Sequence, residues 1–234
     1  MAPQTTSTDT IEYYQRRAPH YDDVYGRPER QQDLRQLDAT VPEFFLGRDV
    51  LEIAAGTGYW TQRIAEAASS VLATDYSAEP LAEAARRTYP HDNVEFRRLD
   101  AYDLNQLSSR HSAAFAGFWW SHMRIDAIDG FLTDLTARLE PESPIVFIDN
   151  RYVEGSSTPI SREDQHGNTY QDRTLPDGTS YEVLKNFPEP AVLEDTGSRF
   201  GTGVRVVEQQ WYWMLTFTTR ERGNLADSTT SANL

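Results

Sequence analysis

The sequence predicts an α/β fold built on a doubly wound, mostly parallel β-sheet with helices on both faces. Short apolar runs recur along the chain and alternate with stretches of helical spacing, the pattern of strands joined by crossover helices. The earliest run, 49–54, ends in a glycine-rich turn that leads into a helical stretch. Hydrophobic residues make up 38% of the 234 residues, which is enough for one substantial core.

Two short helices are expected first, one from residue 11 towards Pro19 and one over 28–39, where Leu34 and Leu37 share a face. The alternating part follows, with strands expected at 49–54, 71–74, 94–99, 113–120 and 145–148 and helices at 60–68, 78–88 and 125–139. Crossovers of this kind are right-handed, so these strands are expected to run parallel to one another.

The alternation stops after residue 150. Residues 151–187 are rich in Gly, Pro, Ser, Thr and Asp and lack strong periodicity, which is more typical of a functional insertion or a small hairpin than of a plain connection. A helix is expected over 189–199, followed by β-rich runs at 203–210 and 211–219, and the last run predicts a closing antiparallel strand.

The polar ends, 1–9 and 223–234, are predicted to be disordered, which leaves residues 10–222 as a single domain.

Composition excludes several classes of function. The net charge of −14 disfavours binding to a nucleic-acid backbone, and the absence of cysteine excludes disulfides, thiolate catalysis and cysteine-based metal sites. No signal peptide and no apolar run long enough to span a membrane is found, so we expect a cytoplasmic protein with no membrane partner. Lys185 is the only lysine among the 22 basic residues, a bias that by itself indicates no function.

Polar and glycine features follow three consecutive strands. Gly56 and Gly58 allow a close backbone approach to a ligand at a helix N-terminus, although an ordinary tight turn would also use them. Asp75 stands where an acidic side chain meets ribose hydroxyls, and Asp100 stands where an adenine amino group could lie. Each aspartate alone is more commonly a helix cap or turn former. Because the carboxyl ends of parallel strands form one crevice, the set favours a nucleotide site there.

These motifs resemble those of the class I S-adenosylmethionine-dependent methyltransferases. The resemblance covers about residues 45–150 and rests on Glu52-Ile-Ala-Ala-Gly56-Thr57-Gly58, Thr74-Asp75-Tyr76-Ser77, Leu99-Asp100-Ala101 and the turn before the fifth strand. It implies a Rossmann-like methyltransferase fold. A dinucleotide fingerprint would need a third glycine where Thr61 stands, so NAD and FAD are disfavoured.

The resemblance also implies roles for particular residues. S-adenosylmethionine is the implied cofactor, with S-adenosylhomocysteine as its product. The N-terminal helices, 11–40, are expected to form a lid. The implied cofactor-binding residues are Tyr14, Tyr21, Glu52, Ala54, Gly56, Thr57, Gly58, Asp75, Tyr76, Asp100, Ala101, Trp120 and Ser121.

His122 is the candidate catalytic residue, because it is the only one of five histidines at a strand end that faces the predicted crevice. It would act as a base on the methyl acceptor, although a capping or backbone-bonded histidine would look the same in the sequence. His20 is a second candidate.

No metal site is expected. Asp149 and Asn150 end the fifth strand where catechol-type enzymes place a magnesium-binding pair, but Ser121 replaces the further aspartate that such a site needs.

The sequence therefore predicts methyl transfer to an oxygen or nitrogen atom of a small molecule. The insertion 151–187 and the lid would form the acceptor pocket. Aromatic residues near it favour a planar or cationic acceptor, namely Trp119, Trp120, Tyr152 and Tyr170. Two alternatives stay open, a non-catalytic cofactor-binding regulatory or partner subunit and metal-assisted catechol-type O-methylation. The acceptor's identity and the oligomeric state are not predicted.

Overall fold

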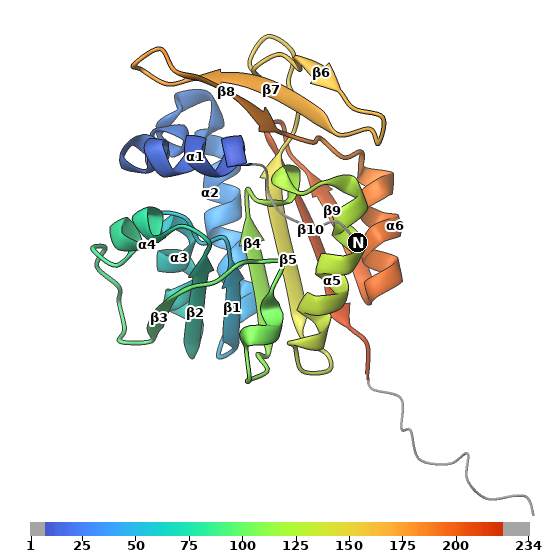
Figure 1. Cartoon of the computed structure of the whole chain (residues 1–234). Coiled ribbons are helices and arrows are strands. Elements are labelled where there is room, and N and C mark those ends of the chain that lie inside the picture. Colours follow the sequence, from blue (N-terminus) through green and yellow to red (C-terminus); the bar gives the residue numbers. More distant parts are fainter. Residues whose placement is uncertain (1–7, 222–234) are drawn as a thin grey trace, which may run out of the picture.

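A seven-stranded sheet forms the centre of the computed structural model, which describes residues 8–221 (Figure 1). The strand order is β3-β2-β1-β4-β5-β10-β9, and the five strands from β3 to β5 run parallel. Strand β10 lies antiparallel between β5 and β9, which confirms the predicted fold class and its antiparallel last strand. The strands are β1 Asp49–Ile53, β2 Ser70–Asp75, β3 Val94–Arg98, β4 Ala113–Gly117, β5 Pro144–Asn150, β9 Gly201–Glu208 and β10 Tyr212–Thr219.

Helices cover both faces of this sheet because each central strand alternates two apolar surfaces. Val50 packs in a core cluster with α2 and α3, whereas its neighbour Leu51 packs in a second cluster with α5 and α6. Leu34 and Leu37, predicted to share one helical face, are both buried in the first cluster. The helices are α1 Thr8–Arg17, α2 Gln31–Thr40, α3 Tyr59–Ala67, α4 Ala78–Ala84, α5 Ile128–Ala137 and α6 Pro190–Phe200.

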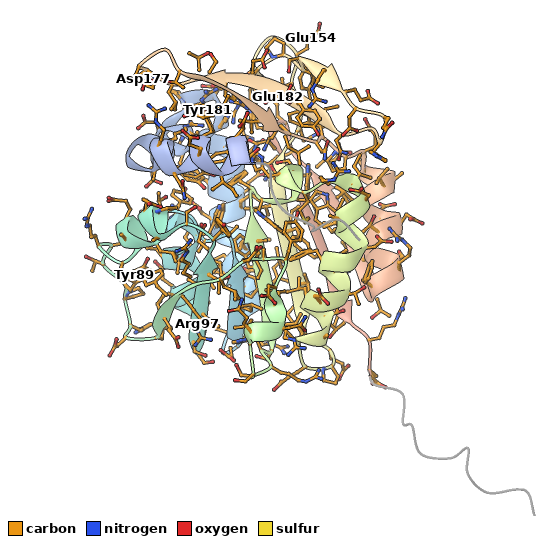
Figure 2. The ribbon with its side chains drawn as sticks, in the orientation of Figure 1. Tyr89, Arg97, Glu154, Asp177, Tyr181 and Glu182 are labelled. Atoms are coloured by element: carbon orange, nitrogen blue, oxygen red, sulfur yellow. The ribbon has the colours of Figure 1, made fainter. Side chains whose placement is uncertain are left out.

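The insertion folds into a small antiparallel sheet of β6 Arg162–Glu163, β7 Thr169–Thr174 and β8 Ser180–Leu184. This sheet lies against α1, at the top of the view in Figure 1. Arg16 of α1 forms an ion pair with Asp177 and donates a hydrogen bond to the hydroxyl of Tyr181. Figure 2 shows both partners on the edge of the sheet above α1. The N-terminal helix and the insertion are thereby joined into one cover.

The structure corrects the sequence prediction at the end of the fourth strand and at the start of the first helix. The apolar run 113–120 is not one strand, because β4 ends at Gly117 and Phe118 adopts a left-handed backbone with φ of 59°. Residues Trp120–His122 then form a short 3-10 helix. Helix α1 already begins at Thr8, and the remaining predictions for 1–9 and 223–234 fall on residues outside the described range. Among residues 8–221, no helix is long and apolar enough to cross a membrane.

Candidate functional site

The turn after β1 opens a cavity at the carboxyl ends of the parallel strands. Ala54 and Gly56 have φ values of 53° and 58°, and an added side chain at Gly56 would meet nothing within 4 Å. At Gly58, with φ of 81°, an added Cβ would lie 2.9 Å from the Cβ of Ala84, so glycine is required for α3 to begin close to α4. Gly56 thus keeps the cavity open, and Gly58 serves packing.

Asp75 links this turn to the end of β2. Its carboxylate accepts hydrogen bonds from the backbone N–H of Gly56 (3.0 Å) and of Ser77 (2.8 Å). Burial raises the pKa of Asp75 to about 6 despite these bonds. A ligand with hydroxyl donors would favour the charged carboxylate, so Asp75 is suited to bind vicinal hydroxyls.

The cavity has a volume of about 360 Å³. Nine of the thirteen cofactor-binding residues predicted from the sequence line it: Tyr14, Tyr21, Ala54, Gly56, Thr57, Asp75, Tyr76, Asp100 and Ala101. His122 lines it too. The sequence prediction missed other residues that line the cavity. Ser77, Leu99, Tyr102 and Trp119 adjoin predicted positions, whereas the remaining ones carried no signal: Thr10, Ile11, Ala18, Pro80, Gly117 and Phe118.

Glu52 lies behind this cavity rather than on its wall. It lines a small neighbouring cavity of about 20 Å³ that shares Ala54, Gly56 and Thr57 with the large one. The Glu52 side chain is buried, and its Oε2 has no hydrogen-bond partner. Burial raises the pKa of Glu52 to about 8. A buried carboxyl group with a free oxygen next to the cavity is suited to receive a cationic group of a ligand, whose charge would favour the ionised form of Glu52.

Two predicted cofactor contacts, Trp120 and Ser121, lie off the cavity because the backbone turns at Phe118. Trp120 is buried against Phe147 and Trp213 instead. Ser121 is fully buried, and its backbone N–H donates to Asp149 over 2.9 Å. Both belong to the structure beneath the site.

A second cavity of about 100 Å³ adjoins the first. Tyr14, Tyr21, Phe118 and His122 line both cavities and therefore mark their junction. The second cavity lies under the small sheet. Gln171 and Arg173 of β7 line it, and so does Lys185, which directly follows β8. Residues of the insertion and of the N-terminal helix thus line one pocket, and its role as the acceptor pocket stays a prediction.

Among the residues that the structure describes, six cationic side chains and no acidic one line the second cavity: Arg17, Arg27, Arg30, Arg151, Arg173 and Lys185. Arg151 pairs with Glu208 (2.8 Å) and Lys185 pairs with Asp149 (3.0 Å). The other four arginines form no ion pair with the acidic residues of the described part of the chain. The cavity is therefore strongly positive in a protein whose net charge is −14.

Lys185 and Asp149 form a buried ion pair at the base of this cavity. Lys185 Nζ also donates to Ser121 Oγ over 2.5 Å. Burial alone would raise the pKa of Asp149, but the Lys185 ammonium and the backbone N–H groups of Ser121 and Asn150 hold it below its usual value. Asp149 stands at the position that the sequence analysis compared with magnesium sites. In this structure it binds the ammonium group of Lys185.

His122 has partners on both ring nitrogens. Nδ1 lies 2.7 Å from the carbonyl oxygen of Leu184, and Nε2 lies 2.9 Å from the hydroxyl of Tyr14. Burial and the neighbouring Lys185 ammonium lower the pKa of His122 to about 3. The imidazole is therefore neutral at physiological pH. The side chain of His20, the second candidate, lies outside the described part of the structure.

The aromatic residues expected to receive the acceptor do not line the second cavity. Trp119 lines the first cavity, and Trp120 is part of the core. Tyr152 packs against Phe187, and Tyr170 lies beside Arg162. The expectation of a planar or cationic acceptor was based on these residues, and the structure does not bring them together at this cavity.

Comparison with known proteins finds similarity to methyltransferases. A family model described as "Methyltransferase domain" matches residues 50–142. The search of curated proteins found no match. The structure titled "DhpI-SAH complex structure" is similar, with 30% identity, a TM-score of 0.73, and coverage of 92% of this chain and 97% of that chain. The "DhpI-SAM-HEP complex" gives 31% identity, a TM-score of 0.71, and coverage of 91% and 99%.

The fold is shared more widely. The N-methyltransferase NodS from Bradyrhizobium japonicum WM9, in complex with S-adenosyl-l-homocysteine, has a TM-score of 0.63 at 13% identity. The match covers 91% of this chain and 100% of NodS. At this identity the likeness concerns the fold alone.

Proposed function

Since this chain belongs to the class I S-adenosylmethionine-dependent methyltransferases, we propose that it methylates an oxygen atom of a small anionic molecule. The enzyme uses S-adenosylmethionine as its cofactor. We assign the cofactor to the 360 Å³ cavity and the acceptor to the adjoining 100 Å³ cavity.

The observation that carries the proposal is the unneutralised positive charge of the acceptor cavity. Arg17, Arg27, Arg30 and Arg173 line it without an acidic partner, and the buried Nε atoms of Arg30 and Arg173 have no hydrogen-bond partner. Like charges held together repel one another, and guanidinium groups bind carboxylate and phosphoryl oxygens in paired hydrogen bonds. An oxyanion would relieve the repulsion and use the free donors, whereas an amine that is cationic at neutral pH would add to it.

Such an acceptor makes little demand for acid or base catalysis. S-adenosylmethionine, when bound, supplies an electrophilic methyl group. An ionised acid is already a nucleophile at neutral pH, so this chain needs to align it and keep water away. The cover formed by α1 and the small sheet provides that enclosure, and the arginines provide the alignment.

The test is a panel of small acids offered with radiolabelled S-adenosylmethionine, compared with neutral alcohols and amines of the same size. We expect methyl esters from the acids, and competitive inhibition of the reaction by inorganic phosphate or sulfate. Arg173→Gln should raise KM for the acid about tenfold or more while cofactor binding stays unchanged, because a charge-assisted hydrogen bond is lost.

Arg97→Gln is the matched control. Arg97 is an exposed arginine on β3, paired with Glu95, and lies away from the small sheet (Figure 2). It should leave KM unchanged. Methylation of amines alone, with no effect of Arg173→Gln, would reject an anionic acceptor. Cofactor binding without turnover of any acceptor would favour the non-catalytic alternative.

A second prediction concerns the cofactor cavity. Asp75→Ala should weaken binding of S-adenosylmethionine by about 1.5–3 kcal/mol, because a charge-assisted bond to the ribose hydroxyls is lost. Titration calorimetry measures this, with Glu79→Ala on the exposed first turn of α4 as control. Asp75→Asn separates binding from turn structure, since the amide oxygen can still accept the Ser77 N–H. An unchanged dissociation constant for the alanine variant would remove Asp75 from the site.

A further inference from the structure

A chain of three groups connects the junction of the two cavities to strand β8. It consists of the Tyr14 hydroxyl, the His122 ring and the backbone carbonyl of Leu184, with contacts of 2.9 and 2.7 Å. Tyr14 and His122 line both cavities, so the hydroxyl lies near the point where cofactor and acceptor would meet.

The chemistry of these groups fixes where each proton lies. A carbonyl oxygen only accepts hydrogen bonds, so His122 Nδ1 must carry a hydrogen and donate it to Leu184. The ring is neutral, which leaves Nε2 as a bare acceptor. Tyr14 must therefore donate its hydroxyl hydrogen to Nε2.

This arrangement determines whether the Tyr14 oxygen can donate or only accept a hydrogen bond in the site. Its only hydrogen is committed to His122, so the oxygen is left with lone pairs and no donor. Such an oxygen cannot hydrogen-bond to an anionic acceptor, but it attracts electropositive groups. The methyl hydrogens of a sulfonium are electropositive, and C–H···O contacts of this type are weak but directional.

Neighbouring aromatic rings hold the ring of Tyr14 in place. It makes edge contacts with the rings of Tyr13 (5.0 Å between centroids), Tyr21 (5.9 Å) and His122 (4.9 Å). Burial raises the pKa of the Tyr14 hydroxyl above its ordinary value, so the group stays protonated. A rigid ring with a fixed hydroxyl direction is a preorganised acceptor.

We propose that Tyr14 is a catalytic residue whose oxygen contacts the transferable methyl group, and that His122 is a positioning residue that turns the Tyr14 hydrogen away. The role of His122 then differs from the general base suggested by its position in the sequence. His122 acts through Tyr14, and Leu184 acts through His122.

The test compares binding of S-adenosylmethionine with that of S-adenosylhomocysteine, which lacks the methyl group and the positive charge. Tyr14→Phe should weaken binding of S-adenosylmethionine about fivefold and leave binding of S-adenosylhomocysteine unchanged. His122→Leu should have the same selective effect, because the Tyr14 hydrogen is released. His122→Gln should keep the relative affinity of the parent protein for the two ligands, since the glutamine side-chain oxygen can accept the Tyr14 hydrogen in place of Nε2.

Equal losses for the two ligands in Tyr14→Phe would show a packing role and overturn the proposal. An unchanged ratio of the two affinities in Tyr14→Phe would also overturn it. A measurement on the unmodified protein is independent of folding in the variants: nitrogen-15 NMR of His122 should show the Nδ1–H tautomer between pH 6 and 9. Finding the hydrogen on Nε2, or an imidazolium ring, would also overturn it. Because no acceptor is present, these results are independent of the anionic-acceptor proposal.

Discussion

Replacing Lys185 by methionine is expected to lower the free energy of unfolding by about 3–5 kcal/mol, because it leaves the buried Asp149 carboxylate without its charged partner. Asp149 is 0% exposed, and within residues 8–221 Lys185 is the only cationic side chain that forms an ion pair with it. Urea denaturation at pH 7 measures the loss. The double variant Lys185→Met with Asp149→Asn should recover most of it, since no uncompensated charge then remains.

Arg162→Met is the matched control for this prediction. Arg162 also lies on the small sheet and pairs with Glu182, but both side chains are more than a third exposed (44% and 38%). An exposed pair contributes up to about 1 kcal/mol, so this variant should lose little stability. Equal losses of unfolding free energy for Lys185→Met and Arg162→Met would show that the buried pair contributes no more to stability than the exposed pair.

Glu52→Gln should stabilise the cofactor-free protein above neutral pH and weaken its hold on the cofactor. The pKa of Glu52 is raised to about 8 in the folded protein, against about 4.3 in an unfolded chain. The folded state therefore binds the extra proton, and stability falls as pH rises from about 4.5 to 8. The glutamine variant lacks this decline and should be more stable than the parent at pH 8 by a few kcal/mol, on the order of 1.4 kcal/mol per pH unit crossed.

The same carboxyl predicts proton release on cofactor binding. If the amino group of S-adenosylmethionine is received by Glu52, its charge lowers the pKa of Glu52 and a proton leaves near pH 7. Calorimetric titrations in buffers of different ionisation enthalpy count that proton. The parent should release one that Glu52→Gln does not. The same count in both proteins would place the amino group elsewhere.

The parallel part of the fold could be predicted because its strands are buried on both faces and read as short apolar runs. The insertion could be predicted as a functional insertion or a small hairpin, but not as a three-stranded sheet. Strands β6 and β7 are polar, β6 is exposed and β7 is only partly buried. Strand β6 pairs with β7, which in turn pairs with β8. The run 113–120 was misread for a related reason. It is apolar throughout, so the left-handed turn at Phe118 leaves no trace in its composition.

The candidate site divides in the same way. The cofactor cavity was predictable because strand order brings consecutive strand ends together, so spacing in the sequence becomes proximity. The cationic pocket was not, since Arg17, Arg30 and Arg173 come from three distant segments that meet only when the insertion folds over α1. Nearly all basic residues of the chain are arginines, so these three did not stand out in the sequence. The cytoplasmic location stays a prediction.

The place of β10 between β5 and β9 has a consequence for synthesis of the protein on the ribosome. The apolar edge of β5 stays unpaired until residue 219 has been translated, and β9 cannot cover it because β9 pairs only with β10. Trp213, Leu215 and Phe217, which complete the core, arrive in the same late segment. Between the translation of β5 and that of β10, the nascent chain therefore presents an open sheet edge. Such an edge is a surface that chaperones bind and through which chains aggregate.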